Sequence, residues 1–113
     1  MSEESMPVRS VADVKIVDVS ADLGSYEAAD LRRTLDELVS QNTRKILVNL
    51  SQVQHICSSA IGAMVGALKR LNQQGGDLKV FGVAENINRT FNLVGATGIV
   101  TIYDTESCAL NDF

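Results

Sequence analysis

The chain has 113 residues, of which 45% are hydrophobic and 21% are charged, and its formal net charge at pH 7 is −4. This length is typical of one domain that buries enough surface to fold without a disulfide or a metal. An acidic chain with only 4% aromatic residues lacks the basic clusters and stacking rings on which nucleic-acid binding depends.

The sequence also bears on the cellular compartment. The first ten residues, MSEESMPVRS, are acidic and polar and do not resemble a signal peptide. No apolar run approaches the roughly 18 residues of a membrane span. We therefore expect a cytoplasmic protein that does not associate with membranes, with Cys57 and Cys108 as free thiols in a reducing compartment.

The first half of the chain predicts two strands and a helix. Residues 1–6 are expected to be a loose N-terminus, and the partial alternation from Val8 to Val19 predicts two short strands with a turn near Ala12-Asp13. Residues 20–25 form a predicted loop. A helix then begins at Ser25 or Tyr26 and closes at Gln41-Asn42, because the apolar residues between them recur at helical spacing.

The second half alternates strands with helices. The apolar run at 45–50 predicts a buried strand, 51–57 a loop, and 58–74 a helix that Gly75-Gly76 ends. A strand at 78–83, a helix at 84–93 with Ile87, Phe91 and Val94 facing inward, a strand at 99–103 and a short helix at 105–110 follow. This order predicts one α/β domain over residues 1–113, with a mixed, mostly parallel sheet of about five strands and an antiparallel pair at its edge.

The segment HICSSAIG at 55–62 holds the only histidine, one cysteine and two adjacent serines. A cysteine-phosphatase loop would need an arginine at position 63, which is Ala63, and no third residue is evident to orient His55 toward Cys57. Nucleotide-binding glycine loops and metal-ligand spacings are also absent from the sequence. The sequence thus predicts no catalytic residue, no metal site and no cofactor.

Ser58 and Ser59 stand where a helix is predicted to begin, which leaves two interpretations open. Either serine could cap the helix by accepting a backbone N–H bond. Alternatively, a phosphate attached there would meet the free N–H groups and the positive end of the helix dipole, so the fold would tolerate it while the surface changes.

Gly62, Ala63, Gly66 and Ala67 form a small-residue face on the same predicted helix. Each glycine within a helix costs about 0.8–1 kcal/mol relative to alanine, so the face needs an explanation. It either packs closely against the sheet or a neighbouring helix, or it is an exposed surface that a partner's backbone approaches.

Four short patterns occur in one order along the chain. These are ILVNL at 46–50, CSSAIG at 57–62, Gly75-Gly76, and INRTFNLVGATGIVTIY with Ile87, Arg89, Phe91 and Gly95 in register. From Val8 to Leu110 the sequence resembles STAS domains, and among them the bacterial anti-sigma factor antagonists. The resemblance implies a mixed sheet with helices packed mainly on one side.

The resemblance further implies a binding switch that is not an enzyme. An unphosphorylated member binds an anti-sigma factor that is also a serine kinase with a histidine-kinase-like ATPase fold, and so frees a sigma factor. Phosphorylation of the first serine of the motif, here Ser58 with Ser59 as second choice, weakens binding, and a serine phosphatase reverses it. A weak homodimer is left open.

Three positions depart from the family pattern: Cys57 and Gly24 stand where the family has aspartates, and Ala60 where it has glycine. A non-switching STAS scaffold, of the stressosome or transporter-associated kind, is therefore an alternative. A redox or hydrolytic protein using Cys57 is a more remote one, since a helix N-terminus lowers a thiol's pKa.

The resemblance also predicts where a partner binds. The partner surface is predicted at the loops 22–25 and 54–59 and the exposed side of the helix 58–74. The predicted contact residues other than Ser58 are Asp22, Leu23, Gly24, Ser25, Asn49, His55, Cys57, Ser59, Ala60, Ile61 and Gly62.

Overall fold

The computed structural model describes residues 6–113, which form one five-stranded sheet in the order β1-β2-β3-β4-β5 with four α-helices and a short 3₁₀ helix. In chain order the elements are β1 (Val8–Val11), β2 (Val14–Asp18), α1 (Ser25–Ser40), β3 (Lys45–Asn49), α2 (Ser58–Gln73), β4 (Asp77–Phe81), α3 (Glu85–Leu93), η1 (Ala96–Gly98), β5 (Thr101–Tyr103) and α4 (Glu106–Asn111). The predicted α/β class and the predicted order of strands and α-helices are confirmed. The 3₁₀ turn η1 was not predicted.

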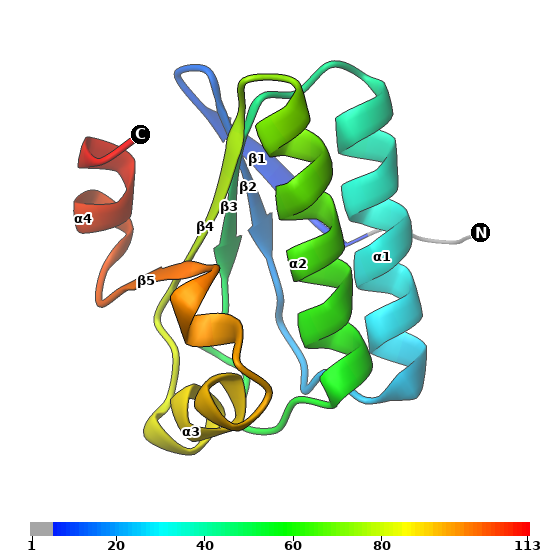
Figure 1. Cartoon of the computed structure of the whole chain (residues 1–113), viewed down its shortest axis with the longest axis vertical. Coiled ribbons are helices and arrows are strands. Elements are labelled where there is room, and N and C mark those ends of the chain that lie inside the picture. The colour runs from blue at the N-terminus through cyan, green and yellow to red at the C-terminus, as the bar shows by residue number, and fades with distance from the viewer. Residues whose placement is uncertain (1–5) are drawn as a thin grey trace.

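The sheet is mixed, as the sequence predicts. β1 pairs with β2 antiparallel, and β2, β3, β4 and β5 pair in parallel, with Ile16 opposite Leu47 and Leu47 opposite Lys79. Because the parallel strands all run the same way, their carboxyl ends meet at one end of the sheet, where α3 also lies (Figure 1). The loops that follow β2 and β3 are therefore brought to the same end of the molecule.

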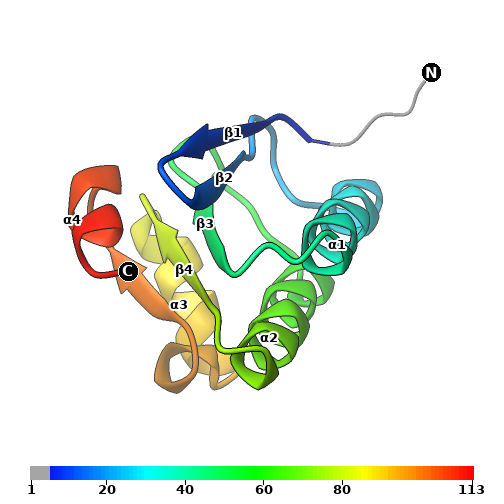
Figure 2. The same ribbon diagram turned by 90° about the horizontal axis from the view of Figure 1, so that it is seen from above.

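The helices lie on both faces of the sheet, with more of them on one face than on the other. Viewed from above, α1 and α2 lie side by side against one face, and the short α4 lies on the opposite side (Figure 2). This arrangement agrees with the expectation of helices mainly on one side. None of the helices in residues 6–113 has the length and apolar character needed to cross a membrane.

Two clusters of buried side chains hold the layers together. The larger lies between the sheet and α1, α2 and α3, and includes the fully buried Leu35, Met64 and Phe91. The smaller lies under α4, where Ala109 packs with Phe81 and other side chains of the second sheet face. Burial of apolar area at about 25 cal/mol per Å² is the dominant stabilising contribution in both.

Three details differ from the sequence predictions. Val94 was expected to face inward, but it caps the C-terminus of α3 and is 49% exposed. The last strand begins at Thr101 and not at residue 99, because the backbone N–H groups of Ile99 and Val100 donate to the carbonyl of Ala96 in η1. Of the predicted loose N-terminus, residues 1–5 lie outside the described residues, whereas Met6 is partly buried and its backbone N–H donates to Thr34 Oγ1 at 3.3 Å.

Candidate functional site

Two loops meet at the carboxyl end of the sheet, residues 20–24 after β2 and residues 51–57 after β3, and we call them the site loops. Leu23 and Ile56 form an isolated parallel bridge. The N–H of Leu23 donates to the carbonyl of His55, and the N–H of Cys57 donates to the carbonyl of Leu23, both at 2.9 Å. The site loops thus continue the pairing of β2 and β3 and deliver residue 58 in a fixed position.

Two side chains strengthen this junction. Asp22 Oδ1 accepts hydrogen bonds from the backbone N–H groups of Gln54 at 2.8 Å and His55 at 3.2 Å. The N–H of Gln54, followed by that of His55, outweighs the opposing effect of burial and holds the pKa of Asp22 below its ordinary value. From the other side, Asn86 Nδ2 in α3 donates to the carbonyl of Gln54 at 2.7 Å.

Ser58 is the first residue of α2, and its side chain is exposed. The N-cap is Cys57, in an extended backbone conformation, and no side chain caps the helix. The interpretation of a serine as a helix cap is therefore wrong for this helix. Among residues 6–113, neither Ser58 nor Ser59 makes a side-chain hydrogen bond, so both hydroxyl groups are available to solvent and to a partner.

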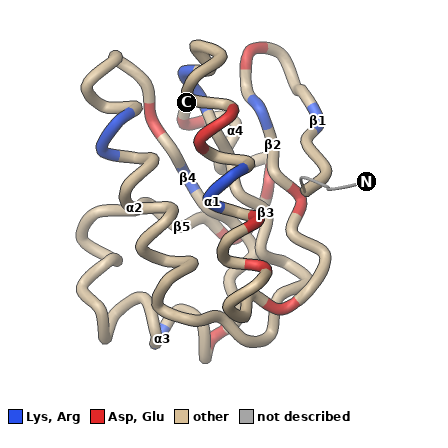
Figure 3. Tube along the Cα trace, turned by 90° about the vertical axis from the view of Figure 1, so that its right-hand side faces the viewer, with Lys and Arg blue, Asp and Glu red and all other residues tan. Residues whose placement is uncertain are grey.

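The start of α2 is electrically neutral apart from its dipole. The helix carries no charged side chain from Ser58 to Leu68, and its only charges are Lys69 and Arg70 near the other end, as the colouring of α2 in Figure 3 shows. With no acidic residue in the first turn, the positive end of the dipole at Ser58 is uncompensated by side chains of this helix. A negative group attached to Ser58 would be electrostatically favoured by the helix itself.

His55 and Cys57 do not form a catalytic pair among the described residues. The side chain of His55 is exposed. Its backbone N–H donates to Asp22 Oδ1, and its carbonyl accepts from the N–H of Leu23. Cys57 is half-buried and packs against the main core. No hydrogen bond links the imidazole to the thiol within residues 6–113, so the arrangement lacks the contact that would activate Cys57 as a nucleophile.

The structure brings most of the predicted contact residues together at this end of the molecule. The exposed ones are Asp22, Gly24, Ser25, His55, Ser58, Ser59 and Gly62. Three others are buried, since Leu23, Ala60 and Ile61 are at most 2% exposed, although Ile61 also lines a surface groove. Their helical and loop positions point them into the core, so they support the site from beneath.

Asn49 is also displaced from the predicted surface. Its side chain donates to Asp18 Oδ1 at 2.8 Å and accepts from the backbone N–H of Ser51 at 2.9 Å. Asn49 lies two residues after Leu47 in β3, so the two side chains lie on the same face of the sheet. Leu47 packs in the cluster under α4, which places this face opposite α2. The structure therefore does not place the Asn49 side chain beside Ser58.

The small-residue face of α2 divides into two kinds of position. Ala63 and Ala67 are buried, which agrees with close packing against a neighbouring element. Gly62 and Gly66 are exposed, and a Cβ built on either would meet no atom within 4 Å. The close-packing interpretation therefore explains the alanines, and the glycines leave an open surface next to Ser58.

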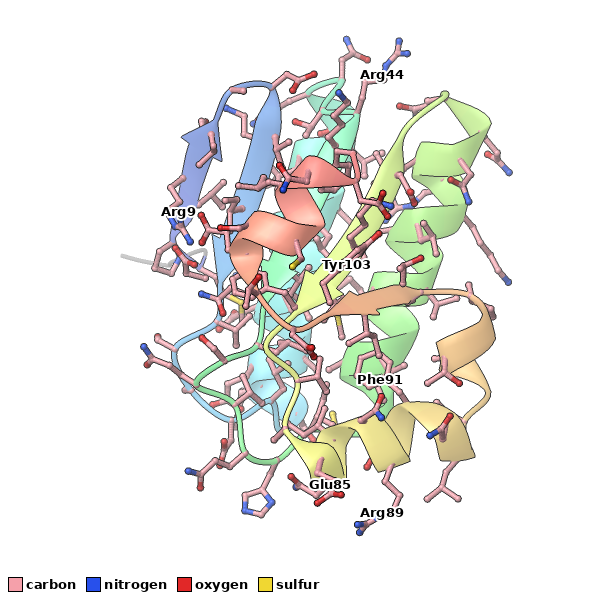
Figure 4. All side chains as sticks on the ribbon, turned by 90° about the vertical axis from the view of Figure 1, so that its left-hand side faces the viewer. Arg9, Arg44, Glu85, Arg89, Phe91 and Tyr103 are labelled. Carbon is pink, nitrogen blue, oxygen red and sulfur yellow. The ribbon has the colours of Figure 1, made fainter. Side chains whose placement is uncertain are left out.

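Sequence reasoning missed a small apolar groove beside Ser58. It lies between α2 and the segment after α3, and Val94 and Ile99 contribute to its wall. Val94 was misassigned because its spacing from Ile87 and Phe91 fits an inward helical face, although α3 ends one residue earlier. Arg89, from the family-like pattern around Phe91, projects away from the sheet, whereas Phe91 points into the core (Figure 4).

Comparison with known proteins agrees with this geometry. The family model of the STAS domain matches residues 5–109. An anti-sigma-B factor antagonist of Staphylococcus aureus is 34% identical over 86 residues, which is 76% of this chain and 80% of that protein.

Solved structures give the same result. The crystal structure of a candidate anti-sigma factor antagonist from Thermotoga maritima superposes with a TM-score of 0.88 at 30% identity, covering 95% of this chain and 92% of that one. The Bacillus cell-fate determinant SpoIIAA in its phosphorylated form shares the fold, with a TM-score of 0.74 at 15% identity over 96% of this chain and 98% of its own. The chain therefore belongs to the STAS domain family, and within it to the anti-sigma factor antagonists.

Proposed function

We propose that this chain acts as an anti-sigma factor antagonist whose affinity for its anti-sigma factor is switched by phosphorylation of Ser58. The observation that carries the proposal is the free, exposed hydroxyl of Ser58 at the start of α2, on the surface formed by the site loops. The name of the Staphylococcus aureus relative and the existence of a phosphorylated form of SpoIIAA support it.

The chemistry requires little of this chain beyond presentation of the hydroxyl. The kinase partner would transfer the γ-phosphoryl group of ATP to Ser58 Oγ, with loss of the hydroxyl proton and release of ADP. A serine phosphatase would hydrolyse the ester and restore the hydroxyl. The chain is thus a binding partner and a substrate in the cytoplasm and not an enzyme.

The switch would work because a phosphate on Ser58 is compatible with the fold but changes the charge of the surface. A phosphate at Ser58 would lie at the positive end of α2, so the fold accommodates it. The same group adds a charge of about −1.5 to −2 to a surface that is otherwise neutral along the first turns of α2. A partner that docks flat on this surface would have to desolvate that charge, which weakens the complex.

The test is a titration of each purified anti-sigma factor of the host that carries a serine-kinase domain. We expect wild type to bind one of them, Ser58→Asp to bind at least about tenfold more weakly, and Ser58→Ala to bind normally but resist phosphorylation by ATP, as followed by intact mass. Ser59→Ala is the matched control and should still be phosphorylated. Lack of binding by wild type, or equal phosphorylation of Ser58→Ala, would overturn the proposal.

The missing aspartates at positions 24 and 57 favour a second candidate, a constitutive STAS scaffold. In that case wild type and Ser58→Asp would retain the same partners with equal affinity. Size-exclusion chromatography would then show large assemblies that do not respond to ATP.

A further inference from the structure

We propose that the groove beside Ser58 receives one large apolar side chain of the anti-sigma factor, and that Ser58 lies on its rim so that phosphorylation closes it. This inference rests on the function proposed above. We call this feature the Ser58 groove. Its rim is formed by Ser58 and Gly62, and its wall includes Val65, Val94 and Ile99.

The groove is apolar and has a well-packed floor. Ile61 and Ala96, which also line it, are each 2% exposed, so the floor is part of the main core. None of the residues that line the groove is charged. In Figure 1, α3 lies at the end of the sheet where α2 begins. The groove is lined by residues of α2 and by Val94, Ala96 and Ile99 from the segment after α3, so two segments distant in sequence form it.

The side chains of the wall are exposed although they are apolar. Val94 is 49% exposed and Ile99 is 48% exposed, and they are two of only five large hydrophobic residues exposed within residues 6–113. They reach this position because Gly95 adopts a left-handed conformation, φ 77°, which turns the chain sharply after α3 into η1. Isolated exposed apolar residues are common, but apolar side chains from two segments that line one concave site can receive an apolar group of a partner.

The size of the groove selects its occupant. Its volume is about 220 Å³. Pockets for small molecules usually have about 300–1,000 Å³, so the groove is too small for a typical cofactor or metabolite. It can also be only a small part of a specific protein–protein interface, which buries roughly 1,200–2,000 Å² of surface. A single anchoring side chain in a pocket at the centre of a wider interface fits these dimensions.

The position of the groove identifies the partner. Its rim includes Ser58, so the groove is continuous with the surface at which the proposed switch operates. An apolar side chain can enter only if the rim can be dehydrated at low cost. A hydroxyl allows this, whereas a phosphate with a charge of about −1.5 to −2 does not. Phosphorylation of Ser58 would therefore weaken binding by preventing the contact between the groove and the partner's apolar side chain.

The experiment uses two matched pairs of variants, titrated with the anti-sigma factor that wild type binds. Ile99→Ser removes part of the wall, and Leu93→Ser makes the same kind of change at a residue that is 80% exposed and does not line the groove. Gly62→Val narrows the rim, and Ala29→Val introduces the same side chain at an exposed position of α1, outside the groove and the predicted partner surface. Thermal unfolding of all four variants checks that they fold.

We expect Ile99→Ser and Gly62→Val to weaken binding by at least about tenfold, and the two controls to change it less than about threefold. We also expect Ser58→Asp to weaken binding less in the Gly62→Val background than in wild type, because both changes act on the same contact. If wild type binds no anti-sigma factor, the proposed function fails and the groove proposal with it. If wild type binds and Ile99→Ser and Gly62→Val bind as tightly, or if each change matches its control, the groove proposal alone is wrong.

Discussion

A single carboxylate, that of Asp22, joins the site loops through hydrogen bonds to two backbone N–H groups. Gly24, where the family resemblance leads us to expect an aspartate, is the residue before the first turn of α1. Within residues 6–113 Asp22 makes no hydrogen bond to Ser58, so we expect its effect on the switch to act through the position of residues 54–57. At this scale the site depends on backbone geometry set by one side chain.

Replacing Asp22 should loosen the loop that leads to Ser58. In Asp22→Ala the amides of Gln54 and His55 lose their acceptor, and we expect their hydrogen exchange to become several-fold faster. Asp22→Asn keeps an oxygen acceptor and should show a smaller change. Hydrogen exchange of both variants measured by NMR is the check, and unchanged exchange in Asp22→Ala would show that the carboxylate is dispensable.

The same hydrogen bonds predict a pH dependence with a definite sign. Because the folded state lowers the pKa of Asp22, its contribution is fully present above the ordinary aspartate value of about 3.9 and is lost as pH falls through the lowered folded pKa. Protection of the Gln54 amide relative to Asp22→Ala should therefore be constant from neutral pH to about pH 5 and vanish only in acid.

Two glycines, one within α2 and one just after it, differ in whether a side chain could be added. Gly66 lies in mid-helix, where an added Cβ would meet nothing within 4 Å. Gly76 follows the helix, and an added Cβ would lie 2.2 Å from the carbonyl oxygen of Arg44. The first glycine is open to substitution and the second is required by the close approach of two backbone segments.

These two positions give a paired stability prediction. Gly66→Ala should raise the free energy of unfolding by about 0.5–1 kcal/mol, because alanine is the better helix former. Gly76→Ala should lower it, by at least about 1–3 kcal/mol, since backbone must shift to relieve the overlap. Urea unfolding measures both. A destabilised Gly66→Ala would mean that the exposed face of α2 is packed in solution.

For the whole molecule, one arginine connects the beginning of the described chain with its end. Arg9 in β1 donates to both carboxylate oxygens of Asp18 in β2, at 2.6 and 3.1 Å. It also donates to Glu106 in α4, at 2.6 and 3.2 Å. Figure 4 shows Arg9 at the edge strand beside α4. The ion pairs thus hold α4 over the smaller core across 97 residues of sequence.

Arg9→Gln should lower stability by about 1 kcal/mol, a modest value because all three side chains are partly solvated. Arg9 holds the pKa values of Asp18 and Glu106 below their ordinary ones. The advantage of wild type should therefore be complete above about pH 5 and disappear as pH falls through the lowered folded values. Urea unfolding at a series of pH values from 7 into acid, with and without added salt, tests this, and a gap that does not narrow as pH falls would contradict it.

Much of the fold could be predicted because its signals are local. The apolar run before Asn49 and the helical spacing of Leu31, Leu35 and Leu38 each depend on neighbouring residues alone. The turn through Gly95 into η1 could not be predicted in this way, because the exposure of Val94 depends on where α3 stops. The buried state of Ile61 and the orientation of Asn49 likewise depend on which sheet face each side chain meets.

The sequence by itself determined the α/β class, the order of strands and helices, the family, and Ser58 as the candidate for modification. These follow from periodicity and from motifs whose spacing is fixed along the chain. Only the tertiary structure decided that the Ser58 hydroxyl is free and not a cap, that Asp22 joins the site loops, and that an apolar groove borders the serine. The physical reason is that each of these depends on contacts between segments far apart in sequence, which no local pattern records.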